Sequence, residues 1–191
     1  MTHSKVVVIT GTPGTGKSKV SQILSLKLGA THVDLSKYAK IEGLILGSDD
    51  FRQTEIVDMK ALREKVNIFP SRNRYIIIEG HYAQDIVPHE TVAIVVVLRR
   101  APWVLKKELE SRGYSHEKVR ENLEAELLGV CLSDALGSHV RGKVCEIDTT
   151  NMAAEETVNI ILELIESKRK CLHGHIDWME YPETKSLLRE L

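Results

Sequence analysis

The chain of 191 residues has few aromatic side chains and no long hydrophobic run, and each shortage excludes a class of protein. Aromatic residues make up 5% of the sequence, so the core has to be built from Val, Ile and Leu. The longest apolar run, Val92–Leu98, is far shorter than the ~20 residues that a membrane-spanning helix needs. The N-terminal run, Val6–Ile9, is too short for a signal peptide. We therefore expect a cytoplasmic protein without a membrane partner.

The sequence also has few cysteines and a net charge close to zero. The sequence has an odd number of cysteines, Cys131, Cys145 and Cys171, and no C-x-x-C motif. We therefore expect neither a zinc site nor a disulfide framework, and a reducing compartment is favoured. The net charge of −1 argues against a protein that coats nucleic acid through its overall positive charge. Binding through a local basic patch remains an open alternative. Apolar residues at 42% indicate one globular domain with a small appendage.

Short apolar runs rich in β-branched residues alternate with stretches of helical periodicity. The predicted strands are Lys5–Thr10, Tyr75–Glu79, Val92–Leu98 and Val144–Asp148, with a weaker one at Thr31–Leu35. The predicted helices are Lys17–Leu28, Glu55–Val66, Pro102–Ser111, Ser115–Leu136 and Ala153–Lys170. Continuous apolar strands are typical of sheets covered on both faces, and alternation with helices indicates βαβ units. The pattern predicts an α/β protein with a parallel sheet and right-handed crossovers.

The tail, Cys171–Leu191, differs in character from the domain over residues 1–170. It contains Trp178 and a short predicted helix, Pro182–Leu191. A large aromatic side chain usually anchors such a segment, which favours a packed C-terminal extension. A partner-binding tail is the alternative interpretation.

A phosphate-binding motif lies between the first strand and the first helix. Residues 11–18, GTPGTGKS, match G-x-x-x-x-G-K-[ST] in the strand-to-helix context that the motif requires. The glycines let successive backbone N–H groups converge on phosphate oxygens, and the helix N-terminus adds the positive end of its dipole. Lys17 would reach the β- and γ-phosphates, and the Ser18 hydroxyl would ligate Mg²⁺. The motif predicts nucleotide binding.

A carboxylate ends the strand Tyr75–Glu79. Three apolar residues followed by Glu79 are typical of a Walker-B strand, whose acid holds Mg²⁺ or its water. His81 follows two residues later and could face the same side. The alternatives are a surface strand end for Glu79 and a hydrogen-bonded loop histidine for His81.

Residues 99–120 carry a net charge of +4. Arg112 precedes Gly113 between two predicted helices, where a lid would hinge, and an arginine there can stabilise a phosphoryl group in flight. Arg99 or Arg100 is the alternative for this role. A solvated helix face is the expected position of Lys106, Lys107 and Lys118.

The region after the second strand is where a small P-loop kinase holds its acceptor. Ser36, Lys40 and Arg52 are the candidates, although Ser36 is equally well a helix N-cap and Lys40 an ordinary exposed lysine. Residues 148–151, DTTN, could border an adenine ring, or Thr150 or Asn151 could be a plain helix cap.

With these residues assembled, the chain resembles the adenylate kinase family, and within it the small CINAP branch. The resemblance covers roughly residues 5–168 and rests on the motif at 11–18, the acid-x-His at 79–81, the segment 109–114 (LESRGY) and the helix from Ser115. It implies a P-loop NTPase three-layer sandwich with a five-stranded parallel sheet of order 2-3-1-4-5. It also implies an acceptor region near residues 34–57 and a lid near 111–121.

The resemblance further implies Mg²⁺-dependent phosphoryl transfer from ATP to AMP, with ATPase activity. It implies a role in maturation of the small ribosomal subunit through a small-subunit ribosomal protein, with indirect RNA contact. The implied catalytic residues are Lys17, Glu79, His81 and Arg112; those for ATP are Gly14, Thr15, Gly16, Lys17, Ser18, Lys19 and Arg112; those for AMP are Ser36, Lys40 and Arg52; and those for Mg²⁺ are Ser18 and Glu79.

Two positions depart from the branch. Glu79 stands where Asp is usual, which extends the reach of the carboxylate by one methylene. Lys40 stands where an arginine is usual, and lysine cannot make a bidentate phosphate contact. Two other functions therefore stay open: an ATPase assembly switch in ribosome maturation, where His81 helps place water, and a kinase for a different small acceptor.

Overall fold

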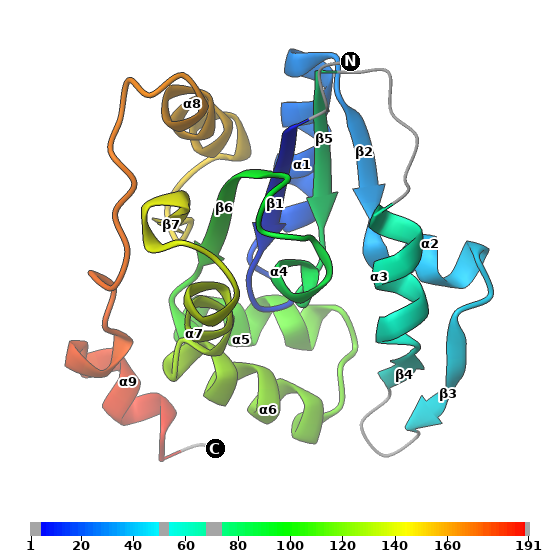
Figure 1. Cartoon of the computed structure of the whole chain (residues 1–191). Coiled ribbons are helices and arrows are strands. Elements are labelled where there is room, and N and C mark those ends of the chain that lie inside the picture. Colours follow the sequence, from blue (N-terminus) through cyan, green and yellow to red (C-terminus); the bar gives the residue numbers. More distant parts are fainter. Residues whose placement is uncertain (1–4, 50–53, 68–73, 190–191) are drawn as a thin grey trace.

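A five-stranded parallel sheet forms the middle layer of the structure, a computed structural model that describes residues 5–49, 54–67 and 74–189 (Figure 1). Its strands are β1 (Lys5–Thr10), β2 (Thr31–Asp34), β5 (Tyr75–Glu79), β6 (Val92–Arg99) and β7 (Val144–Asp148). They lie in the order β2-β5-β1-β6-β7, and every neighbouring pair is parallel. A separate hairpin contains β3 (Ile45–Asp49) and β4 (Thr54–Val57). Without the hairpin strands, the order is the predicted 2-3-1-4-5, which confirms the fold class.

Helices cover both faces of this sheet (Figure 1). Val6 and Val8 of β1 face one hydrophobic core, and Val7 and Ile9 face the other. The first core is closed by α2 (Leu35–Ile41), α3 (Met59–Asn67), α4 (Ala83–Ile86) and α7 (Val130–Ser138), and the second by α1 (Lys17–Leu28) and α8 (Ala154–Ile165). Burial on both faces is the reason why the strand sequences are continuously apolar.

A third cluster lies beyond the carboxyl ends of the strands, where α5 (Pro102–Ser111) and α6 (His116–Leu127) pack together (Figure 1). Leu105 and Leu109 of α5 contact Leu123 of α6 in this cluster, which Leu187 of α9 (Pro182–Leu187) completes. Two short 3₁₀ turns, η1 (Arg141–Lys143) and η2 (Trp178–Glu180), finish the described elements. The tail therefore packs on the domain at α5.

Three of the helices predicted within residues 1–170 differ from the structure. The helix predicted over Glu55–Val66 is wrong at its start, because Glu55 pairs with Ser48 in the hairpin and the helix begins only at Met59. The helix predicted over Ser115–Leu136 is broken at Gly129, whose φ of 64° lies in the left-handed region that glycine adopts without strain. The last long helix ends at Ile165 instead of at the predicted Lys170.

The expectation of unpaired cysteines is wrong for two of the three. Cys145 and Cys171 form a disulfide with their Cα atoms 4.7 Å apart, and Cys131 is free. The pairing arises because the chain after α8 returns alongside β7, where the backbone N–H of Glu146 donates to the carbonyl of Leu172 at 2.8 Å.

Across the described ranges, no helix is both long enough and apolar enough to cross a membrane.

Candidate functional site

The loop between β1 and α1 has the backbone of a phosphate cradle. Gly16 precedes α1 with φ 94° and brings no side-chain cap, so no side chain occupies the N-terminus of the helix. Helix N-termini left open in this way bind anions through unpaired N–H groups and the helix dipole. A Cβ at Gly11, whose φ is 137°, would lie 2.3 Å from the carbonyl oxygen of Leu98. Only glycine therefore lets the loop approach β6 this closely.

Lys17 lies folded over this loop. Its Nζ donates to the carbonyl of Gly11 at 2.7 Å and to that of Thr12 at 3.1 Å. Loss of water around the ammonium lowers the pKa of Lys17, and the Glu79 carboxylate partly opposes that shift. The ammonium is thus held at the loop, next to the position that the motif assigns to the phosphates.

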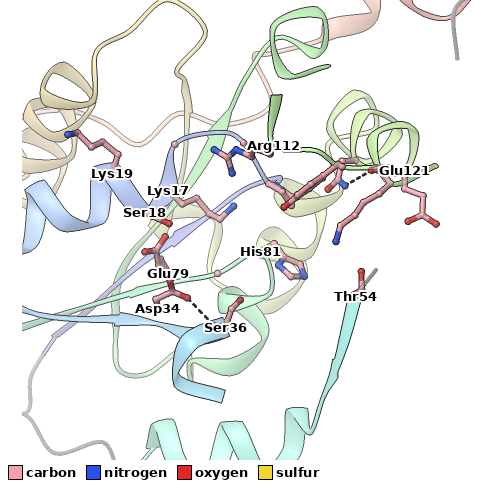
Figure 2. A pocket seen from close by; sticks show the side chains of 17 residues that line it. Lys17, Ser18, Lys19, Asp34, Ser36, Thr54, Glu79, His81, Arg112 and Glu121 are labelled. Carbon is pink, nitrogen blue, oxygen red and sulfur yellow. Dashed lines mark hydrogen bonds between the residues drawn. The ribbon is translucent and has the colours of Figure 1, made fainter. Parts of the chain in front are cut away.

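A cavity of about 640 Å³ opens in front of the loop, at the carboxyl ends of the strands (Figure 2). Of the residues predicted to act there, it is lined by Gly14, Gly16, Lys17, Ser18, Lys19, Ser36, Glu79, His81 and Arg112. Thr15 is not in the lining, because its hydroxyl turns inward and donates to the carbonyl of Thr12 at 2.9 Å. Arg52 lies outside the described residues.

Glu79 is buried at the end of β5 and is held by a histidine that the sequence analysis missed. Its Oε1 lies 2.8 Å from Nε2 of His32 on β2, and the strand register sets Asp34 beside Glu79. The Ser18 hydroxyl faces the same corner of the cavity (Figure 2). Only the pairing of β2 with β5 reveals His32, because nothing in its local sequence marks it.

This corner has the donor chemistry of a magnesium site. Ser18 and Glu79 offer oxygen atoms, which Mg²⁺ prefers, and Mg²⁺ keeps several waters and phosphate oxygens as further ligands. Within the part of the chain that the structure describes, no three His, Cys, Asp or Glu residues cluster as a metal site. The residues therefore fit a magnesium ion bound together with nucleotide phosphates better than a zinc ion in an all-protein cage.

His81 enters the cavity from the loop after β5. Partial desolvation, then the charges of Lys17 and Lys118, lower the pKa of His81 to about 4, so the imidazole is neutral near pH 7. The buried Gln84 fixes this loop: its Nε2 donates to the His81 carbonyl at 3.3 Å, and its Oε1 accepts from Thr10 at 2.6 Å. A neutral ring can accept a hydrogen bond from water or a hydroxyl.

Arg112 hangs over the cavity between α5 and α6 (Figure 2). Its Nε and Nη2 donate to Oε1 of Glu108 at 2.9 and 2.7 Å, an exposed i,i+4 pair. Gly113 follows with φ 73°. The pair is solvent-exposed and therefore weak, so phosphate oxygens can compete with Glu108 for the guanidinium.

Helix α6 and the loop before it contribute residues that the sequence analysis did not place in the site. Tyr114, Lys118, Glu121 and Asn122 all line the cavity. Lys118, expected on a solvated helix face, instead has its Nζ 4.7 Å from the centre of the Tyr114 ring. The helical spacing of these residues was visible, but which face of α6 meets the cavity depends on how it packs against α5.

The sequence of this chain is similar to known proteins over most of its length. Residues 7–129 match the family model of the AAA domain. A "Putative adenylate kinase" of Methanocaldococcus jannaschii is 36% identical over 174 residues, which is 91% of this chain and 93% of that protein. A "Putative adenylate kinase" of Thermococcus gammatolerans is 40% identical over 185 residues, 96% of this chain and 99% of that protein. The chain belongs to the adenylate kinase family. The resemblance seen in the sequence is thereby confirmed.

Solved structures support the fold alone. Shikimate kinase from Acinetobacter baumannii, in complex with shikimate, superposes with a TM-score of 0.61 at 16% identity, over 88% of this chain and 96% of that one. Shikimate kinase from Bacteroides thetaiotaomicron gives a TM-score of 0.57 at 19% identity, over 85% and 98% of the two chains. The P-loop sandwich is therefore shared with kinases that are distant in sequence.

In this adenylate kinase family member, only some of the residues predicted to hold an acceptor line the cavity. Ser36 lines it, and the interpretation of Ser36 as the N-cap of α2 is wrong, because Asp34 caps the helix by accepting from the Ser36 and Lys37 N–H groups at 3.1 and 3.2 Å. Lys40 is not in the lining; its Nζ lies 3.0 Å from Oε1 of Glu55 on β4. Thr54, at the start of β4, does line the cavity.

Residues 148–151 of the family member brace the phosphate loop. Thr149 donates to the carbonyl of Thr15 at 3.1 Å, and the Thr150 hydroxyl accepts from the N–H of Ala101 at 2.8 Å. The interpretation of Thr150 or Asn151 as a helix cap is wrong, because the N-cap of α8 is Ala153.

Arg99, the last residue of β6, and Arg100, which follows it, differ from Arg112. Arg99 is buried and does not line the cavity. Its guanidinium pairs with the carboxylates of Glu126 and Glu146 in the protein interior. Burial disfavours its charge, but these two carboxylates raise the pKa of Arg99 overall. Arg100 donates from Nη1 to the carbonyl of Gly14 at 3.0 Å. The alternative of Arg99 as the phosphoryl-stabilising arginine is therefore wrong, since a guanidinium enclosed by two acids has no path to the phosphates.

Proposed function

We propose that this protein catalyses Mg²⁺-dependent transfer of the γ-phosphoryl group of ATP to AMP. The observation that carries the proposal is one cavity lined together by the phosphate loop, by Glu79 and by a lid arginine, Arg112. The same cavity continues to Ser36 and Thr54, on the side that the family resemblance assigns to the acceptor. The names of the relatives, which are 36% and 40% identical, support AMP as the acceptor.

Positioning and charge neutralisation are what phosphoryl transfer requires, and this chain has residues for both. The loop N–H groups and Lys17 bind the β- and γ-phosphates, and Ser18 and Glu79 hold the magnesium ion. When bound, that ion neutralises charge on the phosphates. Arg112 leaves Glu108 and moves onto the transferring group as the lid over residues 111–121 closes and excludes water.

The acceptor assay tests this proposal. ATP and Mg²⁺ are incubated with AMP, with other nucleoside monophosphates or with shikimate, and ADP formation is compared with an acceptor-free control. We expect AMP to raise ADP formation well above the control and to yield two ADP for each ATP consumed. Equal ADP formation with and without every acceptor would contradict the kinase and leave an ATPase. Stimulation by a different acceptor alone would contradict AMP as the substrate.

ATP hydrolysis is the second activity that the site supports. A neutral His81 close to Lys17 can hold a water in the cavity when the acceptor is absent. By family resemblance, we propose that hydrolysis serves maturation of the small ribosomal subunit, with a small-subunit ribosomal protein as partner. Such a partner can change the ATPase rate only if it prefers one lid state. We expect the purified ribosomal protein to change that rate at constant ATP, and no change on demonstrated binding would contradict the switch.

Glu79→Gln should raise the Mg²⁺ concentration needed for half-maximal turnover by about tenfold, with a smaller effect on ATP affinity. The amide keeps the size of the side chain but loses the charge that holds the metal or its water. Glu79→Asp is the matched control, because it keeps the charge that the branch usually carries here. Mg²⁺ titrations of the turnover rate for the three proteins check this result. An unchanged Mg²⁺ dependence in Glu79→Gln would make Glu79 a structural strand end.

A further inference from the structure

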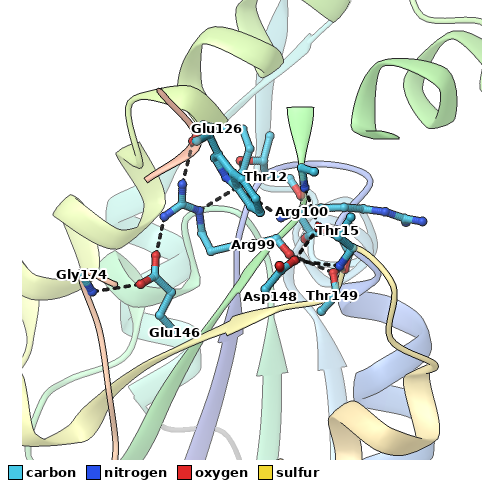
Figure 3. Close-up of polar contacts among 12 residues, drawn as sticks. Thr12, Thr15, Arg99, Arg100, Glu126, Glu146, Asp148, Thr149 and Gly174 are labelled. Atoms are coloured by element: carbon cyan, nitrogen blue, oxygen red, sulfur yellow. Dashed lines mark hydrogen bonds and ion pairs between the residues drawn. The ribbon is translucent and has the colours of Figure 1, made fainter. Parts of the chain in front are cut away.

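A buried carboxylate, Glu126, joins the phosphate loop to the C-terminal tail (Figure 3). Its Oε2 accepts a hydrogen bond from the Thr12 hydroxyl of the loop at 2.6 Å. Its Oε1 accepts from Nε of Arg99 at 2.7 Å and from the indole N–H of Trp178 at 2.9 Å. Thr12 and Trp178 lie far apart in the sequence, yet they share one acceptor group.

The tail makes a second set of contacts with the same buried ion cluster. Glu146 pairs with Arg99, and its Oε2 accepts from the backbone N–H groups of Gly174 and His175 at 2.9 and 3.3 Å (Figure 3). Arg99, Glu126 and Glu146 bring one positive and two negative charges into the interior. Buried charge is costly unless it is fully hydrogen-bonded, and the tail supplies several of the required donors.

The indole ring of Trp178 is fixed as well as bonded. It is 1% exposed and packs edge-on against Trp103 of α5 at 5.9 Å between ring centres. Its N–H therefore has a fixed direction toward Glu126. A shift in the position of the Glu126 carboxylate therefore alters the hydrogen bond to Trp178, and loss of that hydrogen bond alters the position of the carboxylate. The reason is that hydrogen bonds in a buried network polarise and constrain one another.

We propose that Trp178 is a positioning residue for the nucleotide site: through Glu126 it sets the Thr12 side of the phosphate loop, so the tail is a working part of that site. This inference rests on the nucleotide binding in the proposed function and adds a role for residues outside the cavity. A tail that only stabilises the fold would change nucleotide affinity to the same extent with or without the Thr12 hydroxyl. The two roles therefore predict different results when Thr12 is replaced.

The chain contains two tryptophans, so Trp103→Phe leaves Trp178 as the only indole fluorophore. In this variant, ATP should change the emission of Trp178 with the same Kd that calorimetry gives for ATP binding. Adding Thr12→Val, which removes the hydroxyl but keeps the side-chain shape, should abolish the change while calorimetry still detects binding. Emission that stays constant at saturating ATP, or that responds equally with Thr12→Val, would overturn the inference.

A double-mutant cycle gives the second test. Trp178→Phe removes the N–H donor and should weaken ATP binding by about threefold to tenfold, the scale of one buried hydrogen bond. In the Thr12→Val background the same substitution should have little further effect, because the path to the loop is already broken. Trp103→Phe is the matched control, whose effect, if any, should be equal in both backgrounds. Equal weakening by Trp178→Phe in both backgrounds would overturn the inference.

The two tests separate this inference from the proposed function. If the wild-type protein bound no ATP by calorimetry, both would be overturned. If ATP bound but the two tests gave independent effects, the nucleotide site would stand and the role of Trp178 would be refuted. The fluorescence test uses a variant with Trp178 intact, so it decides the inference even where Trp178→Phe does not fold.

Discussion

Lys17→Ala should lower phosphoryl transfer and ATP hydrolysis by about a thousandfold or more, equivalent to about 4 kcal/mol of transition-state stabilisation. The ammonium is held at the phosphate loop by the carbonyls of Gly11 and Thr12, and alanine leaves the phosphates without this fixed charge. Lys19 cannot replace it, because its side chain points away from Lys17 (Figure 2). Single-turnover rates with and without AMP, with circular dichroism to confirm folding, check this result.

Lys19→Ala is the matched control for that experiment. It removes an identical charge two residues away, at the edge of the same cavity. We expect its loss of turnover to be at least tenfold smaller than that of Lys17→Ala. Normal turnover in a folded Lys17→Ala protein, or equal losses in the two variants, would contradict the assignment of the motif as the phosphate site.

Arg112→Lys should lower turnover by about a hundredfold or more and change ATP affinity far less. Lysine keeps the charge but lacks the planar fork that bridges two phosphate oxygens. In the structure the guanidinium is bound to Glu108, so we expect it to reach the phosphates only when the proposed lid closes over both substrates. Single-turnover transfer rates beside an ATP-binding isotherm measure the two effects separately.

Arg120→Lys is the control for Arg112→Lys. Arg120 lies on α6, pairs with Glu117 at 2.8 Å and is not in the cavity lining, so its replacement should leave turnover within about twofold. If Arg112→Lys turned over at the wild-type rate, or lost only ATP affinity, Arg112 would not be the lid catalyst. Arg100, which already reaches the carbonyl of Gly14, would then become the next candidate.

Local signals predicted much of the architecture. The strands β1, β5 and β7 and the helices α1 and α5 have the bounds expected from the sequence. Each is delimited by nearby residues: Gly29 takes a left-handed φ of 56° after α1, and Pro102 stands in the first turn of α5. Such signals act over a few residues, so they can be recognised before any tertiary contact is known.

The hairpin and the disulfide were not predicted. The hairpin of β3 and β4 was missed because Ile56 and Met59 fit a helical spacing, whereas the pairing of Glu55 with Ser48 decides that β4 is a strand. The disulfide between Cys145 and Cys171 depends on the return of the tail along β7. Neither the register of a hairpin nor the neighbour of a cysteine is a property of one local segment.

The sequence by itself determined the phosphate loop, the sheet strands and the candidate carboxylate at the end of β5, because these follow from residue type and spacing within short windows. Only the tertiary structure decided what the charged side chains do. The sequence favours Arg112 as the lid arginine and leaves Arg99 as an alternative, and only the structure shows that Arg99 is enclosed by Glu126 and Glu146 whereas Arg112 stays exposed above the cavity. The chemistry of a guanidinium depends on its solvent exposure and its partners, and the tertiary structure fixes both, by bringing Glu126 and Glu146 to Arg99 and by leaving Arg112 exposed beside Glu108.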